Sequence, residues 1–225
     1  MVGQSQTPPS SRGRTTKRET QKERSLRTRQ AILEGCAVVF AQTPYSAVRI
    51  HDLLEQEGVT QGGIYHHFPG AKEEIAAEII SEMLRAQEEI ARSSMGEDGI
   101  KSIAAISRHL VDELNTSVIL RAGWRLITHN EGVFGDAAGS GVKTVLAECL
   151  QRARESGDLR DGLTTEQAVE GFYSIFVGTQ INAFLRSGWR DLPQSIRHME
   201  SFALRAIATD EYLESADFIG KPGYP

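Results

Sequence analysis

The segment VRIHDLLEQEGVTQGGIYHHFP, residues 48–69, predicts two short helices joined by a tight turn. The first helix is expected over residues 48–56, where apolar residues recur at helical spacing. These residues are Ile50, Leu53 and Leu54. Gly58 suits the left-handed backbone that commonly follows a helix, and Thr60 can cap the second helix by accepting a free backbone N–H. The segment therefore indicates a helix-turn-helix motif.

The second helix of this motif has a composition that folding alone does not favour. Two consecutive glycines, Gly62 and Gly63, each cost a helix about 1 kcal/mol relative to alanine. Glycine at a helix start allows a phosphate to approach the backbone closely, and a helix N-terminus attracts anions. Polar side chains that can contact base edges or phosphate oxygens form its outer face: Gln61, Tyr65, His66 and His67. We interpret this helix as a DNA reader; the alternative is a solvated turn in which Ile64 and Phe68 are buried.

Positive charge is concentrated at the start of the chain. The first 30 residues hold eight Lys or Arg and two Glu, a net charge of +6, whereas the whole chain carries −5. A basic arm beside the motif, on an otherwise acidic chain, favours attraction to phosphate through that end. The alternative that composition leaves open is a disordered, solubilising tail.

Other classes of function have weak support in the sequence. Cys36 and Cys149 are the only cysteines, which disfavours a disulfide framework and is typical of a reduced, cytoplasmic setting. The chain shows neither a secretory signal nor an apolar run of about 18 residues, so we expect a cytoplasmic protein without a membrane span. AGSGVKT, residues 138–144, lacks the glycine that a phosphate-binding loop needs before its lysine, and His66 and His67 have no partners at metal-ligand spacing. We therefore expect no catalysis, no cofactor and no metal.

The rest of the chain shows helical rather than strand periodicity. Thr20 and Glu23 have capping-box spacing at the start of a long amphipathic helix. Apolar stripes at helical spacing occur within residues 32–40, 75–84, 103–114, 118–126, 142–150, 172–184 and 196–207. Gly157 is expected to close one of these helices and Pro193 to open the last. No segment alternates with a two-residue period, so an all-α protein is predicted.

The helix expected near residues 164–184 carries small or apolar residues on more than one side, including Gly171, Ser174, Gly178 and Ala183. Such a helix needs two packing partners, its own core and a second surface. A homodimer joined by a four-helix bundle would supply that second surface. A helix buried at the centre of a monomer is the alternative that composition leaves open.

These features together resemble the tetracycline-repressor (TetR) family of bacterial regulators. The matching residues are TRQAILEGCAVVF at 28–40, Tyr45, Ile50, GVTQGGIYHHF at 58–68 and KEEI at 72–75. The segment VILRAGWRLIT, residues 118–128, is also similar to the γ-butyrolactone autoregulator receptors within that family. The resemblance implies an N-terminal three-helix helix-turn-helix domain and a C-terminal helical domain for ligand binding and dimerisation. It further implies a repressor that a small lipophilic signal, γ-butyrolactone-like or related, releases from a pseudo-palindromic operator in double-stranded DNA.

The residues and the resemblance together assign domains and candidate sites. The expected domains are a basic, flexible arm at 1–22, the helix-turn-helix domain at 23–71, the helical domain at 72–210 and a tail at 211–225. Candidate DNA-binding residues are Arg27, Arg49, Thr60, Gln61, Gly62, Gly63, Tyr65, His66, His67 and Lys72. Candidate ligand-binding residues are Trp124, Ile127, Phe134, Phe172, Tyr173, Phe176, Gln180 and Trp189. Core packing is an equally good interpretation of each aromatic residue in the second set, and no tryptophan stands near Val142, where butyrolactone receptors typically have one.

Several positions depart from the family pattern. Pro44 replaces a glycine that usually ends the first helix, Val48 replaces a phosphate-contacting threonine, and Glu57 replaces a small residue between the two helices. Gln61 stands where lysine is common, and the loop at 69–71 has one extra residue. The alternative is therefore a small-molecule sensor or partner-binding protein that keeps the fold with weak or lost sequence-specific DNA binding. Against this, the basic arm would add cationic contacts that raise DNA affinity.

Overall fold

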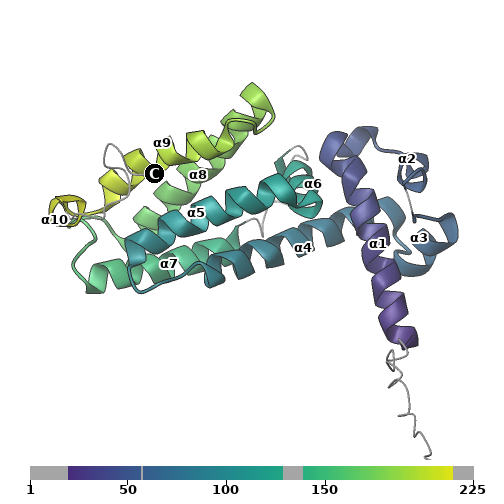
Figure 1. Ribbon diagram of the computed structural model, residues 1–225, viewed down its shortest axis with the longest axis horizontal. Coiled ribbons are helices and arrows are strands. Elements are labelled where there is room, and N and C mark those ends of the chain that lie inside the picture. The colour runs from purple at the N-terminus through teal and green to yellow at the C-terminus, as the bar shows by residue number, and fades with distance from the viewer. Residues whose placement is uncertain (1–19, 57, 129–138, 215–225) are drawn as a thin grey trace, which may run out of the picture.

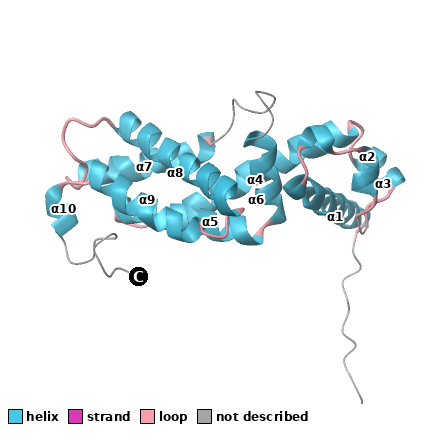
Figure 2. Cartoon of the chain, turned by 90° about the horizontal axis from the view of Figure 1, so that it is seen from above, coloured by secondary structure: helices cyan, strands magenta, loops and turns pink. Residues whose placement is uncertain are grey.

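The computed structural model describes residues 20–56, 58–128 and 139–214, which form helices joined by turns (Figures 1 and 2). In chain order the elements are α1 (Gln21–Gln42), the 3-10 helix η1 (Tyr45–Ala47), α2 (Ile50–Leu54), α3 (Gln61–His67), α4 (Ala71–Ser93), α5 (Gly99–Thr116), α6 (Val118–Thr128), α7 (Ser140–Glu155), α8 (Thr165–Ser187), α9 (Leu192–Ile207) and α10 (Asp210–Glu214). No β-strand occurs within these ranges, so the predicted all-α class is confirmed. Residues 1–19 of the expected arm, Glu57, Phe134 and the tail from 215 onward lie outside the described residues.

The first helix begins at the capping box that its sequence predicts. Thr20 accepts the Glu23 backbone N–H at 3.2 Å, and its own N–H donates to Glu23 Oε2 at 2.7 Å. These two bonds satisfy donors that a helix start otherwise leaves unpaired. Consequently α1 starts at Gln21, within the segment that we assigned to the arm. Its apolar stripe is buried: Ile32, Leu33, Cys36, Ala37 and Phe40.

The first helix of the motif is shorter than the predicted 48–56. Val48 has an extended backbone and is buried, so the helix does not begin there. Instead the Arg49 N–H donates to Asp52 Oδ2 at 2.7 Å, and this contact fixes the start of α2 at Ile50. The helix ends at Leu54, and Gly58 adopts the expected left-handed backbone with φ of 78°. The local turn chemistry was predictable, whereas the helix boundaries were not.

The long helix α4 connects the helix-turn-helix to the remaining helices (Figure 1). Helix α6 lies at the end of the helical body nearest the motif, and it packs against both α1 and α4 (Figure 1). Buried apolar side chains from both parts form one continuous core. Direct packing through α6 therefore joins the helical body to α1, which supports the motif.

Helices α7 and α8 end in left-handed turns. Gly157 follows α7 with φ of 80°, as its sequence predicts, and Gly188 and Trp189 end α8 with φ of 60° and 68°. Pro193 lies in the first turn of α9, but α9 is not the last helix, because α10 follows. Tyr212 in α10 donates to the Asp98 carboxylate at 3.0 Å, which ties this short helix to the start of α5. None of the described helices is both long and apolar enough to cross a membrane.

Candidate DNA-binding and ligand-binding sites

Helix α3 is held by its cap and by two buried side chains. Thr60 Oγ1 accepts the Gly63 N–H at 3.1 Å, which confirms Thr60 as the predicted cap. Ile64 and Phe68 are buried, and the Arg29 guanidinium lies 4.5 Å above the Phe68 ring. The opposite face of α3 is exposed at Gln61, Gly62, Tyr65 and His66. A rigid helix thus presents polar groups outward, as direct contact with DNA requires.

The two consecutive glycines have different physical explanations. A Cβ at Gly63 would come 2.9 Å from Thr60 Oγ1 and 3.1 Å from Ile32 Cδ1, so packing beneath the cap excludes a side chain. A Cβ at Gly62 would meet no atom within 4 Å. Nothing in the fold therefore requires glycine at position 62, and close approach of a phosphate to that backbone remains the explanation that we favour.

Charge is scarce on the exposed face of α3. Its residues include two histidines but neither lysine nor arginine. Burial, followed by the charges of His66 and Arg29, lowers the pKa of His67, which disfavours the charged form of this imidazole. Arg27 on α1 and Arg49 before α2 are exposed cations elsewhere in the motif's domain.

Lys72 is less available to DNA than its assignment assumed. Its Nζ donates to the Val48 carbonyl at 2.7 Å and lies 4.1 Å from the centre of the Tyr45 ring. These contacts hold the start of α4 against the entry to α2. The widened loop precedes this anchor, and within it Ala71 takes a left-handed φ of 46°. Lys72 therefore has a positioning role inside the motif in this structure.

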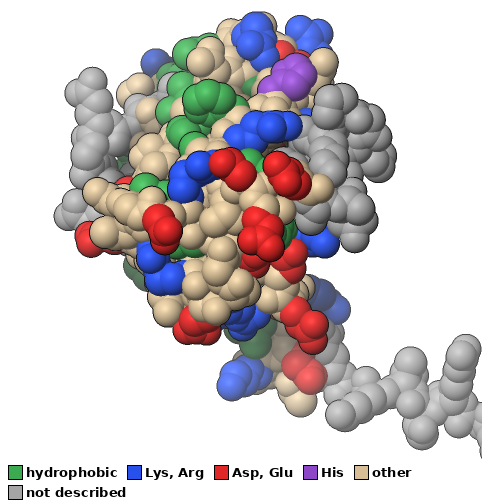
Figure 3. Space-filling model, turned by 90° about the vertical axis from the view of Figure 1, so that its left-hand side faces the viewer, with side chains coloured by type: hydrophobic (Ala, Val, Ile, Leu, Met, Phe, Trp, Pro, Cys, Tyr) green, Lys and Arg blue, Asp and Glu red, His purple; other side chains and the backbone are tan. Residues whose placement is uncertain are grey.

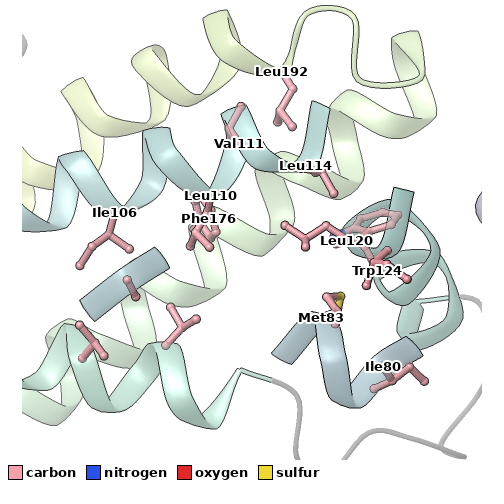
Figure 4. Packing of buried hydrophobic residues seen from close by; sticks show 14 of the residues in the cluster. Ile80, Met83, Ile106, Leu110, Val111, Leu114, Leu120, Trp124, Phe176 and Leu192 are labelled. Atoms are coloured by element: carbon pink, nitrogen blue, oxygen red, sulfur yellow. The ribbon is translucent and has the colours of Figure 1, made fainter. Parts of the chain in front are cut away.

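A cavity of about 160 Å³ lies within the helical body. It is lined by residues of α4, α5, α6 and α8 and by the start of α7. These residues are Met83, Leu84 and Gln87 of α4, Leu110 of α5, Trp124, Ile127 and Thr128 of α6, Gly139 and Val142 at the start of α7, and Tyr173, Phe176, Val177 and Gln180 of α8. Figure 4 shows Met83, Leu110, Trp124 and Phe176 on four different helices around this region. The walls are mainly apolar, with a few polar groups, which is the usual composition of a small-molecule site.

The structure brings five of the predicted ligand-binding residues to the cavity wall: Trp124, Ile127, Tyr173, Phe176 and Gln180. Phe172 is buried in the core instead and does not line the cavity. Trp189 does not line the cavity but packs against two residues that do. Its ring centroid lies 4.7 Å from that of Trp124, and its Nε1 donates to the Gln180 carbonyl at 3.1 Å. The contributions of α4, α5 and α7 were not predicted, although Val142 stands at the position where a tryptophan was missing.

The cavity wall carries no ionised side chain among the described residues; its polar groups are Gln87, Thr128, Tyr173 and Gln180. Burial and the nearby Glu170 raise the pKa of Tyr173, which keeps its phenol neutral. The closest cation to that ring, Lys143 Nζ at 4.9 Å, is paired with Glu170 at 2.8 Å. The wall is therefore electrically neutral.

Large apolar side chains are exposed on α8 and α9. These are Ile175, Ile181 and Leu185 on α8 and Phe202 on α9. Leu185 is 75% exposed and Phe202 is 69% exposed, so neither side chain is packed in the core. In Figure 3 hydrophobic side chains gather toward the top, where α8 and α9 lie in Figure 1, and charged side chains are prominent below. A face of this kind is typical of a protein interface.

Comparison with known proteins agrees with this geometry. The sequence model of the family described as bacterial regulatory proteins, tetR family, matches residues 32–79. These residues run from α1 into α4. The A-factor receptor protein of Streptomyces griseus is 28% identical over 187 residues, which cover 82% of this chain. This chain spans 65% of the length of that relative.

Two further comparisons extend beyond the helix-turn-helix. The transcriptional repressor AcnR of Corynebacterium diphtheriae is 30% identical over 165 residues, covering 68% of this chain and 82% of AcnR. The crystal structure of TylP, a TetR regulator from Streptomyces fradiae, superimposes with a TM-score of 0.67 and 25% identity, covering 86% of this chain and 85% of TylP. The chain therefore belongs to the TetR family of bacterial transcriptional regulators.

Proposed function

We propose that this protein is a homodimeric repressor whose binding to a pseudo-palindromic DNA operator is weakened when a small, lipophilic, uncharged ligand occupies the cavity. The observation that carries this proposal is the position of α6. Its residues Trp124, Ile127 and Thr128 line the cavity, and the same helix packs against α1 and α4. One helix thus contacts both the candidate ligand site and the support of the candidate DNA reader.

Ligand response follows from this shared helix. A ligand that requires more space displaces α6, and α1 must then move or lose its packing against α6. Because packed helices occupy discrete arrangements rather than deforming continuously, such a ligand favours one arrangement of the motif over another. Ligand and DNA then oppose each other by the same factor, as thermodynamic linkage requires. γ-Butyrolactone-like signals are the ligand class that the resemblance of residues 118–128 supports.

Dimerisation follows from the exposed apolar face on α8 and α9. A second copy that covers this face by two-fold symmetry forms a four-helix bundle from α8 and α9 of each protomer. The same symmetry places two α3 helices for successive major grooves, which lie about 34 Å apart in DNA. Ligand binding lowers affinity when it changes that separation or the angle between the two motifs.

A gel-shift titration with the promoter DNA beside the protein's own gene tests the proposal. We expect a complex that survives competitor DNA, contains a protein dimer by native mass measurement, and dissociates when a γ-butyrolactone is added. Tyr65→Ala should weaken this complex at least about fivefold, since a good base contact is worth about 1–3 kcal/mol. His109→Ala, an exposed change on α5 outside the motif, is the control. Absence of a specific complex at any salt concentration would overturn the proposal.

The second candidate is a sensor of the same fold with little sequence-specific DNA binding. It is favoured by the internal contacts of Lys72 and by the lack of lysine and arginine on α3. Equal affinity for promoter DNA and for random DNA, together with ligand binding in the cavity, would support this alternative.

A further inference from the structure

Gln180 is an unusual member of the cavity wall. It lies on α8, lines the cavity and is only 6% exposed. Its backbone carbonyl accepts the Trp189 Nε1–H at 3.1 Å, which holds this part of α8 against the indole. Among the residues that the structure describes, none forms a hydrogen bond with the Gln180 side-chain amide. This part of α8 therefore presents an amide to the cavity, and none of the described residues pairs with that amide.

Such an amide points to a ligand. Buried polar groups in folded proteins are nearly always hydrogen-bonded, and an unpaired one costs free energy that an apolar residue would not. An apolar residue of similar length, such as methionine, would fill the same position without that cost. The cost is recovered when a bound molecule supplies the missing partners, and this gives the site its selectivity.

The charge of the wall limits the class of ligand. No ionised side chain lines the cavity among the described residues, and Lys143 near the Tyr173 ring is already paired with Glu170. A charged ligand would lose its hydration without gaining a counter-ion, which is strongly unfavourable. The part of the wall that the structure describes therefore favours an uncharged ligand.

The volume of the cavity limits the size of the ligand. An apolar cavity of about 150 Å³ in a protein is sufficient to hold benzene. The cavity here measures about 160 Å³, which corresponds to a single five- or six-membered ring. A ligand with a longer chain needs the surrounding helices to move, which is the movement that the proposed function requires.

From these observations we infer that Gln180 is the specificity-determining residue of the cavity, and that the ligand is an uncharged ring bearing a carbonyl next to a hydrogen-bond donor. The amide Nε2 donates to the ligand carbonyl, and Oε1 accepts from the neighbouring donor. A cyclic amide, or a lactone with an adjacent hydroxyl group, offers this pattern. The inference rests on the proposed function, because it specifies the ligand of the same cavity.

Three ring compounds of equal size test the inference. 2-Piperidinone offers a carbonyl beside an N–H, cyclohexanone offers a carbonyl alone, and methylenecyclohexane offers neither. Binding can be followed by tryptophan fluorescence, because both tryptophans of the chain are at the cavity: Trp124 lines it, and Trp189 packs on Trp124 at 4.7 Å. Each compound is titrated into the full-length protein, Gln180→Met and the exposed control Gln151→Met on α7.

We expect Gln180→Met to weaken 2-piperidinone on the order of tenfold, since two hydrogen bonds are lost, and cyclohexanone by a smaller factor. Binding of methylenecyclohexane should change by less than about twofold or become tighter, because an apolar ligand does not use the amide. Gln151→Met should behave as the parent protein. If Gln180→Met weakens all three compounds equally, or none of them, the inference is wrong.

Two further readouts keep the result interpretable. If Gln180→Met does not fold, Gln180→Leu also removes both the donor and the acceptor, and it should weaken 2-piperidinone more than methylenecyclohexane. Unchanged selectivity in Gln180→Leu would also overturn the inference. Operator binding is measured separately: selective binding of 2-piperidinone without any response of DNA binding to ligand rejects the proposed function alone. Operator release by a ligand whose affinity does not depend on Gln180 rejects this inference alone.

Discussion

Replacing Gly123 with alanine would insert a methyl group between α6 and α4. A Cβ at Gly123 would lie 2.7 Å from both Cβ and Sδ of Met83, whereas ordinary contact begins at 3.4 Å. Met83 is 2% exposed and borders the cavity. Its side chain must therefore move into the cavity, or α6 and α4 must separate by about 0.7 Å, the difference between those two distances. Either response tests the helix contact on which the proposed mechanism depends.

The expected loss of stability follows from two opposing terms. Overpacking a core costs about 1–3 kcal/mol, and replacing glycine with alanine within a helix returns up to about 1 kcal/mol. With overpacking at the middle of its range, about 2 kcal/mol, the net loss is about 1–2 kcal/mol, which for a chain of this length lowers Tm by roughly 2–8 °C. Affinity for 2-piperidinone should also fall, because a displaced Met83 side chain occupies part of the cavity.

Thermal unfolding monitored by circular dichroism measures this effect. Gly62→Ala is the matched control, since it makes the same change within a helix where a Cβ meets no atom within 4 Å. Its Tm should equal or exceed that of the parent protein. A Tm for Gly123→Ala that matches the parent or rises would show that α6 and α4 do not approach as closely as described, and the coupling through α6 would lose its basis.

Acidification should tighten DNA binding, because burial lowers the pKa of His67 and protonation below that pKa adds a cation to α3. His67→Asn should flatten this pH dependence when DNA binding is measured by fluorescence anisotropy. An unchanged slope would exclude His67 as its source. Ala71→Gly should raise the free energy of unfolding by about 0.5 kcal/mol, since glycine relieves the left-handed φ of 46°, and a decrease in urea titration would contradict the strain. Glu200 is buried, and although it accepts a 2.6 Å hydrogen bond from Ser107, desolvation raises its pKa. A carboxyl group with a raised folded-state pKa stabilises most below its unfolded value of about 4.3, and this contribution is lost as pH rises through the folded value. Glu200→Gln should therefore remove a decline in stability between acidic and neutral pH, and identical Tm profiles against pH would refute this.

The turns and caps of the motif were predictable because their causes are local. Thr20 and Glu23 form the expected capping box, Thr60 caps α3, and Gly58 takes the left-handed turn. In each case the deciding atoms lie within four residues of each other along the chain. Sequence patterns report such interactions directly.

Contacts between distant residues were not predictable in this way. Lys72 is one of the candidate DNA-binding residues, and the sequence did not predict that its amine donates to the Val48 carbonyl 24 residues earlier. The cavity residues of α4 and α5 were missed for a related reason. An apolar stripe has the same spacing whether it faces a packed core or a cavity. The sequence therefore does not show that Met83 and Leu110 line the cavity. Gln87, a polar residue near the stripe of α4, was the one available signal.

The apolar periodicity of helix α8 does not show which of its faces lines the cavity and which is exposed. Phe176 and Gln180 on one side line the cavity, and Ile181 and Leu185 on another side are exposed. Successive residues differ by about 100° around a helix axis, so the step from Gln180 to Ile181 passes from the cavity wall to the proposed dimer face. A helix that is apolar on both faces has little contrast between them, and its sequence cannot say which face meets which partner. Because α8 carries both the cavity residue Gln180 and the proposed dimer face, a ligand that binds Gln180 would act on the helix that also contacts the partner protomer. Under the proposed function, the separation of the two α3 helices would then be controlled at two places, by α6 through its packing against α1 and by α8 through the partner protomer.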